Sequence, residues 1–317
     1  MGDERVTALI GDIGGTNARF ALAEPHVPPS PVEPRIFKCA EHATIADAIR
    51  TYLSDLPGVR PDRAVLAVAC PIMGDRVIQN NGPWEFSIAA LQAELGLAEL
   101  RIVNDFFAMS HGVASLTSDR LEAIGPVGFD TASDGPWVVI GPGTGLGAGI
   151  IVDPGPPARI LESEGGHLGF APSDAEEIRI AQALLTSQDA PSWERILCGP
   201  GLRRLYEILN DGREAPTPED IIRLGLDGSD ASCRAALDRF CSLLGAAAGD
   251  MALMVKARRV YLVGGIVQSA VPFLKSGGFR RRFEARGRYG NVLDRVPTIA
   301  ALGTDVGLIG AAAIAGQ

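Results

Sequence analysis

Short continuous apolar runs, the pattern typical of buried strands, mark the beginning of the chain. The first run, Val6–Ile13, leads into Gly14 and Gly15, and a second run, Ala18–Ala23, follows directly. Arg35–Ala40 has the same character. We therefore predict that the chain opens with a meander of β-strands around a glycine-rich turn.

A helical period replaces this pattern in the segment Thr44–Leu56. Its apolar residues recur three and four positions apart, which places them on one face of an amphipathic helix. The elements predicted after it are a buried strand at Arg63–Pro71, a helix at Ser87–Leu97 with Ser87 as its N-cap, a strand at Leu100–Asn104 and a helix at Phe106–Leu116.

The order of strand, glycine turn and strand recurs about 130 residues later. The apolar run Trp137–Ile140 enters the glycine-rich segment Gly141–Gly149 and continues in Ile150–Val152. This faint internal duplication favours two related domains. The stretch Asp119–Gly135, which contains several glycines and prolines, is the predicted linker between them.

The second half of the chain is rich in helical patterns. The predicted helices are Ala175–Ser187, Gly201–Leu209, Pro218–Leu226 and Ala231–Lys256, followed by a strand at Arg259–Val263. A last helix of small residues, Asp305–Ala315, is expected to pack back on the first domain. The predicted domains are a small α/β domain, residues 1–117 plus 304–317, and a large α/β domain with extra helices, residues 118–303.

Composition is that of a globular chain with an excess of glycine. Hydrophobic residues make up 46% of the 317 residues and the net charge is −9, which excludes a disordered chain. The acidic balance argues against a nucleic-acid partner, and no apolar run is long enough to predict a membrane span. The five scattered cysteines contain no C-x-x-C pair, so we expect no zinc site and a cytoplasmic location. Many of the 38 glycines cluster beside apolar segments, a pattern that indicates close approach of the backbone to a ligand or to another part of the chain.

Both glycine-rich turns suggest phosphate binding, because exposed backbone N–H groups can cradle anionic oxygens. The chain lacks the Gly-Lys pair of a Walker A loop, and both turns run into strands rather than opening a helix as a dinucleotide fingerprint does. We therefore predict a phosphate clamp of two hairpins, one from each domain, containing Thr16 and Thr144. In it, Asp12 is suited to hold Mg²⁺ directly or through water. Ordinary glycine hairpins are the alternative.

Asn104 and Asp105 stand where an apolar strand ends and a helix begins. The pair alone favours a helix N-cap, a position for which both residue types are preferred. The alternative makes Asp105 a general base that removes a hydroxyl proton, while Asn104 bonds a neighbouring hydroxyl.

A carboxylate and an imidazole, Glu164 and His167, flank two glycines. The sequence offers no third metal ligand beside them, so a metal site is disfavoured. Such a pair suits contacts with adjacent hydroxyls of a sugar. The arginine-rich run Phe279–Arg288 is interpreted as a solvated helix face, with a polyphosphate or nucleotide contact as the alternative.

Seven segments, taken in their order and spacing, resemble the bacterial ATP-dependent glucokinase family. They are GDIGGTNARFAL, VACPIMGDRVIQNNGPWEFS, IVNDFFAMSHGV, IGPGTGLGAGI, ESEGGHLGFAP, SWERILCGPGLRRLYEIL and VYLVGGI. The resemblance spans essentially the whole chain. It implies the two-domain actin-like ATPase (ribonuclease-H-like) α/β fold with a central cleft. It also implies Mg-ATP-dependent phosphorylation of the 6-hydroxyl of glucose, in a homodimer.

The resemblance also assigns roles to individual residues. It implies that Asp105 is the catalytic base and that glucose is bound by Asn104, Glu164, His167, Glu194 and Asn81. For ATP it implies the first phosphate segment Gly11, Asp12, Ile13, Gly14, Gly15 and Thr16, the second phosphate segment Gly143, Thr144 and Gly145, and the adenosine-contacting Gly264 and Gly265. Asp12 is in addition the expected Mg²⁺ ligand.

Two alternatives remain open. The acceptor could be another hexose, such as fructose, mannose or an N-acetylated amino sugar. The chain could also be a catalytically silent sugar or nucleotide sensor on the same fold, although a sensor has no need of both Asp105 and Asp12. The related repressor, open-reading-frame and kinase group usually carries a Cys-rich zinc motif after its E-x-G-H segment, and the chain lacks it after His167.

Overall fold

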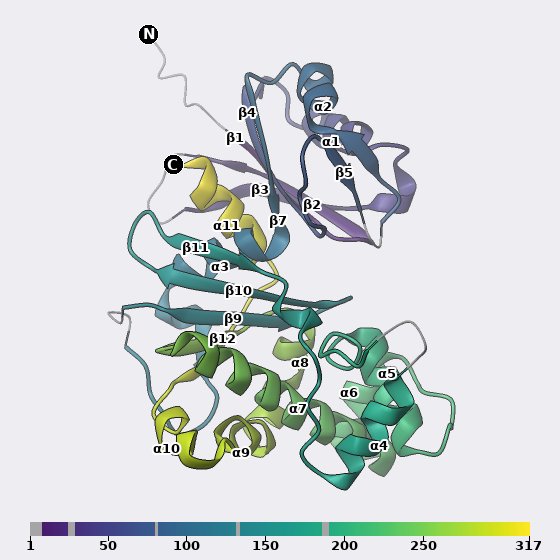
Figure 1. The fold of residues 1–317 in the computed structure, drawn as a ribbon. Helices are drawn as coiled ribbons and strands as arrows, with labels where there is room; N and C mark the ends of the chain where they lie inside the picture. The colour runs from purple at the N-terminus through teal and green to yellow at the C-terminus, as the bar shows by residue number, and fades with distance from the viewer. Residues whose placement is uncertain (1–7, 25–28, 80–81, 131–133, 186–189) are drawn as a thin grey trace. The chain divides into compact units, whose positions relative to one another are not determined.

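The computed structural model describes residues 8–24, 29–79, 82–130, 134–185 and 190–317. They form two compact units (Figure 1), each assembled from separated pieces of chain. The first unit contains the chain up to residue 116 together with residues 155–162 and 304–317, and the second contains residues 117–154 and 163–303. Within the described ranges, no helix has the length and apolar character needed to cross a membrane.

The first unit is an α/β structure. Its elements are β1 (Ala8–Ile13), β2 (Asn17–Ala23), β3 (Pro31–Lys38), η1 (Cys39–Glu41), α1 (Ile45–Ser54), β4 (Arg63–Val68), β5 (Arg76–Ile78), β6 (Glu85–Ser87), α2 (Ile88–Leu95), β7 (Glu99–Asn104), α3 (Asp105–Ala114) and α11 (Val306–Ala315), with most of β11 (Arg159–Ser163). The main sheet has the order β3-β2-β1-β4-β7, in which β1 runs antiparallel to β2 and parallel to β4. β5 and β6 form a separate antiparallel hairpin.

The two faces of the main sheet bury different helices because side chains alternate along each strand. Leu9 and Leu66 belong to one apolar cluster with residues of α1 and α2. Ile10 and Val65, their neighbours in sequence, belong to another cluster with residues of α3 and α11. The helix α11 thus packs on the first unit, as the sequence predicts.

Local signals set the helix starts in this unit. Thr44 caps α1 in a reciprocal capping box with Asp47, in which each side chain accepts a backbone N–H at 3.1 Å. Ser87 caps α2, and the left-handed Gly96 ends it. Both predicted helices and the Ser87 cap are confirmed.

The second unit combines a sheet with a large helical layer. Its elements are η2 (Ser118–Arg120), β8 (Leu121–Ala123), β9 (Trp137–Pro142), β10 (Leu146–Asp153), η3 (Gly165–His167), α4 (Ala175–Leu184), α5 (Gly199–Leu209), α6 (Pro218–Asp227), α7 (Ala231–Val255), β12 (Arg259–Leu262), α8 (Gly265–Leu274), α9 (Gly278–Glu284), η4 (Gly287–Tyr289), α10 (Gly290–Leu293) and β13 (Thr298–Ala301). The long helix α7 packs against α5, α6 and α9, and its buried face carries Leu237, Phe240 and Leu244. Figure 1 shows α7 and α8 beside the strands β9 and β12.

The two units repeat one strand arrangement. In the second unit β10, β9, β12 and β13 lie side by side in that order, with β9 antiparallel to β10 and parallel to β12. This is the arrangement of β2, β1, β4 and β7 in the first unit. The recurrence seen in the sequence therefore extends to the topology of both sheets.

The interpretation of Asp119–Gly135 as a linker is wrong in its first part. Residues Leu121–Ala123 form β8, which pairs antiparallel with β13, and Ile124 is buried in the core of the second unit. The partner strand lies more than 170 residues further along the chain, so local pattern carries no sign of this pairing.

The interpretation of the arginine-rich run as a solvated helix face holds for the exposed Arg281 and Arg288 and is wrong for Arg280 and Arg282. Arg280 of α9 is buried and donates to the carbonyl groups of Leu293 and Val296 at 2.8 and 2.7 Å. Arg282 pairs at 3.1 Å with Glu177 of α4, whose side chain is fully buried. These arginines satisfy buried acceptors of the second unit.

Candidate active site

Asp12 lies in β1, close to the first glycine turn. It faces Arg19 across the β1–β2 hairpin, with Arg19 Nη1 at 3.4 Å from Asp12 Oδ2. Burial raises the pKa of the Asp12 carboxyl, and the Arg19 charge acts in the opposite direction. The carboxylate also packs on the first turn of α11, because a Cβ at Gly307 would lie only 2.9 Å from Asp12 Cγ. The amino end of a helix favours a negative charge, so α11 adds to the stabilisation of the ionised Asp12.

Arg19 is a candidate that the sequence interpretation missed. Its Nε is buried and has no hydrogen-bond partner among the described residues. A buried donor without an acceptor is costly unless a ligand satisfies it. An anionic group next to Asp12 and the glycine turn fits this requirement. One arginine on a strand gives no local signal, because only the pairing across the hairpin places it beside Asp12.

The first glycine turn is closed by a backbone hydrogen bond of its own and is held in place by hydrogen bonds from Gln79 and Cys39. Gly14 N–H donates to the carbonyl of Asn17 at 3.0 Å. The Gly14 carbonyl accepts hydrogen bonds from Gln79 Nε2 at 2.9 Å and from Cys39 Sγ at 3.5 Å. The Cys39 N–H bonds the carbonyl of Thr16 at 2.9 Å. Four contacts therefore fix the shape of this turn.

The residues expected to bind phosphate at this turn differ in accessibility. Thr16 is exposed, and Gly14 and Gly15 are partly accessible. Gly11 and Ile13 are buried inside the sheet. Backbone groups of the turn are thus available to a ligand, whereas Ile13 packs in the apolar core of the first unit.

The second glycine turn connects β9 to β10. Gly143 N–H donates to the Gly145 carbonyl at 2.8 Å, and the Gly143 carbonyl accepts from Gly199 N–H at the start of α5 at 2.8 Å. Glu194 Oε2 accepts the N–H of Leu146 at 3.0 Å, and a Cβ at Gly145 would lie 2.5 Å from that oxygen. Only glycine leaves room for the Glu194 carboxylate at this turn.

Three of the residues expected to bind glucose come together in the second unit. His167 Nε2 lies 3.7 Å from Glu194 Oε1. The Glu194 N–H donates to the Gly166 carbonyl at 2.8 Å, and the His167 N–H to the Glu164 carbonyl at 3.0 Å. The side chain of His167 is 61% exposed and that of Glu194 is 34% exposed, so both can reach a polar ligand. The structure thus brings Glu164, His167 and Glu194 to one place beside the second turn.

Asn104 and Asp105 occupy the start of α3 in the first unit. Asn104 is the N-cap: its Oδ1 accepts the N–H groups of Phe106 and Phe107 at 2.8 and 3.1 Å. Its Nδ2 donates to the carbonyl of Cys70 at 3.5 Å. Asp105, the first helical residue, is half-buried and its Oδ1 accepts Phe106 N–H at 2.9 Å. The cap is therefore confirmed for Asn104, and it leaves Asp105 as a separate carboxylate fixed at the end of β7.

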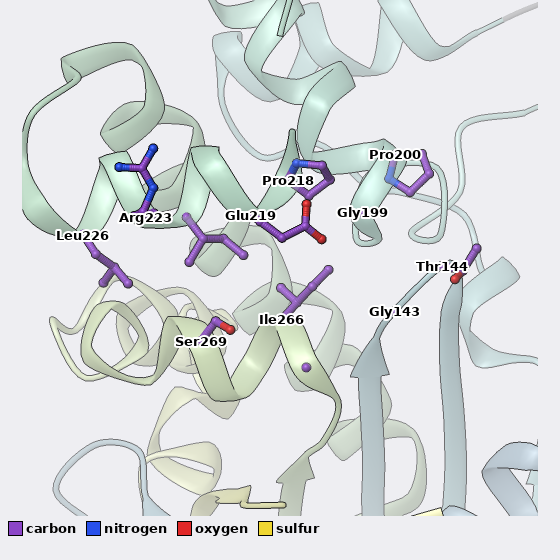
Figure 2. Close-up of a pocket in the computed structure, with 12 residues that line it drawn as sticks. Gly143, Thr144, Gly199, Pro200, Pro218, Glu219, Arg223, Leu226, Ile266 and Ser269 are labelled. Carbon is purple, nitrogen blue, oxygen red and sulfur yellow. The ribbon is translucent and has the colours of Figure 1, made fainter. Parts of the chain in front are cut away.

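A cavity of about 710 Å³ lies in the second unit (Figure 2). Its lining includes Gly143 and Thr144 of the second turn and Gly265 of α8, which the sequence assigned to ATP. The remaining lining residues were not foreseen; they are Gly199, Pro200, Pro218, Glu219, Ile222, Arg223, Leu226, Ile266 and Ser269. They come from α5, α6 and α8, so only the packing of these helices brings them together. A cavity with mainly apolar walls, a few polar side chains and a glycine turn at its edge suits an aromatic base joined to phosphates.

Gly264 and Gly265 sit where β12 passes into α8. Gly264 has φ of +97°, a conformation that favours glycine, and a Cβ there would lie 3.0 Å from the Pro142 carbonyl. Gly265 is exposed toward the cavity, with nothing within 4 Å of its Cβ position. The pair therefore turns the chain sharply and leaves the amino end of α8 open.

One expected glucose-binding residue, Asn81, lies outside the described residues. For metal binding, no group of three or more His, Cys, Asp or Glu side chains that could hold an ion occurs among the described residues.

Comparison with known proteins decides the family. The family model described as Glucokinase matches residues 9–317. The chain belongs to the glucokinase family. A glucokinase of Caulobacter sp. strain K31 is 40% identical over 96% of this chain and 93% of its own length.

Solved structures agree with this family and its fold. The crystal structure of a glucokinase from an Antarctic psychrotroph superposes with a TM-score of 0.82 at 32% identity, covering 98% of each chain. A glucokinase of Streptomyces griseus from the repressor, open-reading-frame and kinase group, solved with glucose and AMPPNP, has a TM-score of 0.70 at 19% identity and covers 97% of this chain and 98% of its own. The actin-like ATPase fold predicted from the sequence is confirmed.

Proposed function

We propose that the chain transfers the γ-phosphoryl group of ATP to the 6-hydroxyl of glucose, with Asp105 as the general base. ATP-dependent sugar kinase activity follows from membership of the glucokinase family. The assignment of Asp105 as the base rests on the start of α3, where Asn104 and Asp105 have different roles. Asn104 is the N-cap, and Asp105 Oδ1 also accepts the Phe106 N–H at 2.9 Å, which supports a fixed position for the Asp105 carboxylate beside the cap.

Asp105 removes the proton from the attacking hydroxyl. A carboxylate within hydrogen-bond reach of the acceptor oxygen raises its nucleophilicity as the bond to phosphorus forms. We assign the orientation of the sugar to Asn104, Asn81, Glu164, His167 and Glu194. The Asn104 Nδ2 and the carboxylates of Glu164 and Glu194 provide the donor and acceptors that sugar hydroxyls need.

The nucleotide is assigned to the two glycine turns and the cavity of Figure 2. Gly14 and Gly143 use their own N–H groups to close the two turns. The backbone N–H groups of Gly15, Thr16, Thr144 and Gly145 then stabilise negative charge on the phosphates, and Gly264 and Gly265 open the amino end of α8. Gly11 and Ile13 act in this proposal by keeping β1 in place. A neighbour of the same fold was solved with both glucose and AMPPNP, which supports this pair of substrates.

Asp12 is the proposed ligand of Mg²⁺. Mg²⁺ held there would neutralise negative charge on the phosphates of the nucleotide. The Asp12 carboxylate, whose side chain is 15% exposed, fits the cation, and the unpartnered Nε of Arg19 fits a phosphate oxygen of the nucleotide that brings it. Arg19 limits the rise in the Asp12 pKa and so helps to keep that carboxyl ionised.

We further propose that the domains are residues 1–117 plus 304–317 and residues 118–303. The compact units differ from this division mainly at residues 155–162, which cluster with the first unit. The enzyme would act at the entry of glycolysis as a cytoplasmic homodimer. The free cysteines among the described residues fit a reducing compartment, and sedimentation of the purified protein tests the dimer.

A matrix of sugars and nucleotides tests the function. ADP release is measured with purified protein, Mg²⁺ and ATP in the presence of glucose, fructose, mannose or an N-acetylated amino sugar. The proposal expects glucose to give the highest kcat/KM. Faster turnover of another hexose would identify a different acceptor, and binding of glucose without ADP release would identify a sensor.

A further inference from the structure

Gln79 is a buried amide that connects two segments of the first unit. It is 5% exposed and follows β5. Its Nε2 donates to the Gly14 carbonyl of the first glycine turn at 2.9 Å. Its Oε1 accepts the N–H of Trp84 at 3.3 Å. Both ends of one amide are therefore used, one on each segment.

The segment on the second side of this amide is a short connection between β5 and β6. Gln79 N–H donates to the Trp84 carbonyl at 3.2 Å, so the backbone closes the connection at its base. Gly82, inside it, packs directly on the amide, because a Cβ there would lie 2.1 Å from Gln79 Oε1. The connection contains Asn81, to which the proposed function assigns a glucose contact.

A second route joins the same two segments. The Trp84 indole N–H donates to the His42 carbonyl at 3.1 Å. Three residues earlier, Cys39 bonds the carbonyls of Gly14 and Thr16. This route runs through the Trp84 indole, backbone groups and the Cys39 thiol and does not use the Gln79 side chain, so we expect it to remain when Gln79 is replaced.

We propose that Gln79 is a positioning residue that couples the phosphate turn at Gly14 to Gly82 and Trp84, the described residues that follow Asn81 in the sequence. This inference rests on the proposed function for the roles of the two segments. The amide itself contacts no substrate in this proposal. Its bond to the Gly14 carbonyl fixes that peptide and so the direction of the N–H groups in the turn, and its bond to the Trp84 N–H fixes the residue just before β6. A buried, doubly satisfied amide has one low-energy orientation, so displacement of either segment strains the other.

Two substitutions separate the two ends of the amide. Gln79→Glu keeps an oxygen that can accept the Trp84 N–H but places a second carboxylate oxygen against the Gly14 carbonyl. Gln79→Leu removes both hydrogen bonds at similar volume. Binding of AMPPNP and of glucose is measured separately by titration calorimetry, so the result needs no turnover. We expect Gln79→Glu to weaken AMPPNP binding about tenfold with glucose affinity held within about twofold, and Gln79→Leu to weaken both.

The pH dependence of AMPPNP binding by Gln79→Glu distinguishes this role from a general loss of packing, which would not change with pH in the same way. A buried Glu at this position has a raised pKa. Protonation turns it into an O–H donor that can restore the bond to Gly14. The ratio of AMPPNP affinities between wild type and Gln79→Glu should therefore shrink as the pH falls from 8 to about 6.

Gln92 offers a matched control. Its Nε2 also donates to backbone carbonyls, those of Leu97 and Ala98 at 3.3 and 3.0 Å, but at the end of α2. Gln92→Glu and Gln92→Leu should leave both affinities unchanged. The proposal is overturned if Gln79→Glu leaves AMPPNP affinity unchanged, if it weakens both ligands equally at every pH, or if the Gln92 variants behave like those at Gln79. Absence of glucose phosphorylation by the wild type, with the calorimetric pattern intact, would instead contradict the proposed function.

Discussion

Gly307, in the first turn of α11, lies against the carboxylate of Asp12, which is almost three hundred residues earlier in the chain. A Cβ at Gly307 would stand 2.9 Å from Asp12 Cγ and 3.0 Å from Oδ2, closer than atoms in van der Waals contact. The position of the proposed Mg²⁺ ligand therefore depends on a helix from the other end of the sequence.

A methyl group at Gly307 should displace Asp12. We expect Gly307→Ala to lower kcat/KM for Mg-ATP roughly tenfold, about 1.4 kcal/mol, because the carboxylate loses its proposed place beside the phosphates. Glucose affinity should stay near that of the wild type. Steady-state kinetics over a range of Mg²⁺ concentrations measures this. Gly316→Ala, just past the other end of α11, is the control, because a Cβ there would lie 3.7 Å from the carbonyl oxygens of Ala312 and Ala313. Equal effects in both variants would contradict the prediction.

Removal of the base should separate chemistry from binding. We expect Asp105→Asn to cut kcat by about 10²–10⁴ while glucose affinity changes little, since the proton acceptor is lost and the start of α3 remains capped by Asn104. Rapid-quench turnover and calorimetric titration of glucose provide the two measurements. Near-normal turnover would remove Asp105 from the role of base.

Glu194 should matter for the sugar through its charge. Glu194→Gln retains an oxygen for the Leu146 N–H but loses the carboxylate that faces His167. We expect glucose affinity to fall roughly 10- to 100-fold, because hydrogen bonds to a charged group are worth about 1.5–3 kcal/mol. The exposed Glu162 provides Glu162→Gln as a control. Unaltered glucose titrations for Glu194→Gln would exclude the contact.

The cavity of the second unit should bind the nucleotide base. Ile266→Trp places a large ring in it and should raise KM for ATP roughly tenfold with KM for glucose unchanged. Ile178→Trp, at an exposed position of α4, should leave both constants unchanged. If ATP kinetics are the same in both variants, the base binds elsewhere.

The buried His111 should make the folded protein less stable in mild acid. Burial, together with the charge of Arg101, lowers its pKa to about 4. The unfolded chain binds the proton near pH 6.5, so the free energy of unfolding falls as the pH drops from about 6.5 toward 4. The full contribution is about 3 kcal/mol. Urea unfolding of His111→Gln should show a flatter pH dependence than the wild type between pH 7.5 and 5; parallel curves would show that His111 does not titrate in this way.

Features that depend on nearby residues could be predicted from the sequence. The helix starts at Thr44 and Ser87 follow from a capping side chain and an apolar period within a few residues. The glycine turns and the pair Asn104–Asp105 are likewise local. The order of these motifs along the chain identified the family, because each alone is common.

Features that depend on distant pairing could not be predicted. The contact of Gln79 with Gly14 joins residues 65 positions apart, and the burial of Arg280 depends on carbonyls of the segment that follows α9. Arginine in a charged run is usually solvated, and three-residue strands such as β8 have no period to detect. The lining of the cavity escaped prediction for the same reason, since it is the product of three helices meeting.

The discontinuous first unit has a consequence for synthesis. The strands β1, β4 and β7 and the helix α3 are synthesised early. The helix α11, which covers one face of their sheet, is synthesised only after the whole second unit. Until then Ile10, Val65 and their neighbours are uncovered, and Asp12 lacks the helix end it packs against. The nascent chain therefore carries an unfinished phosphate site throughout most of its translation. Completion of the first unit is a late event in synthesis.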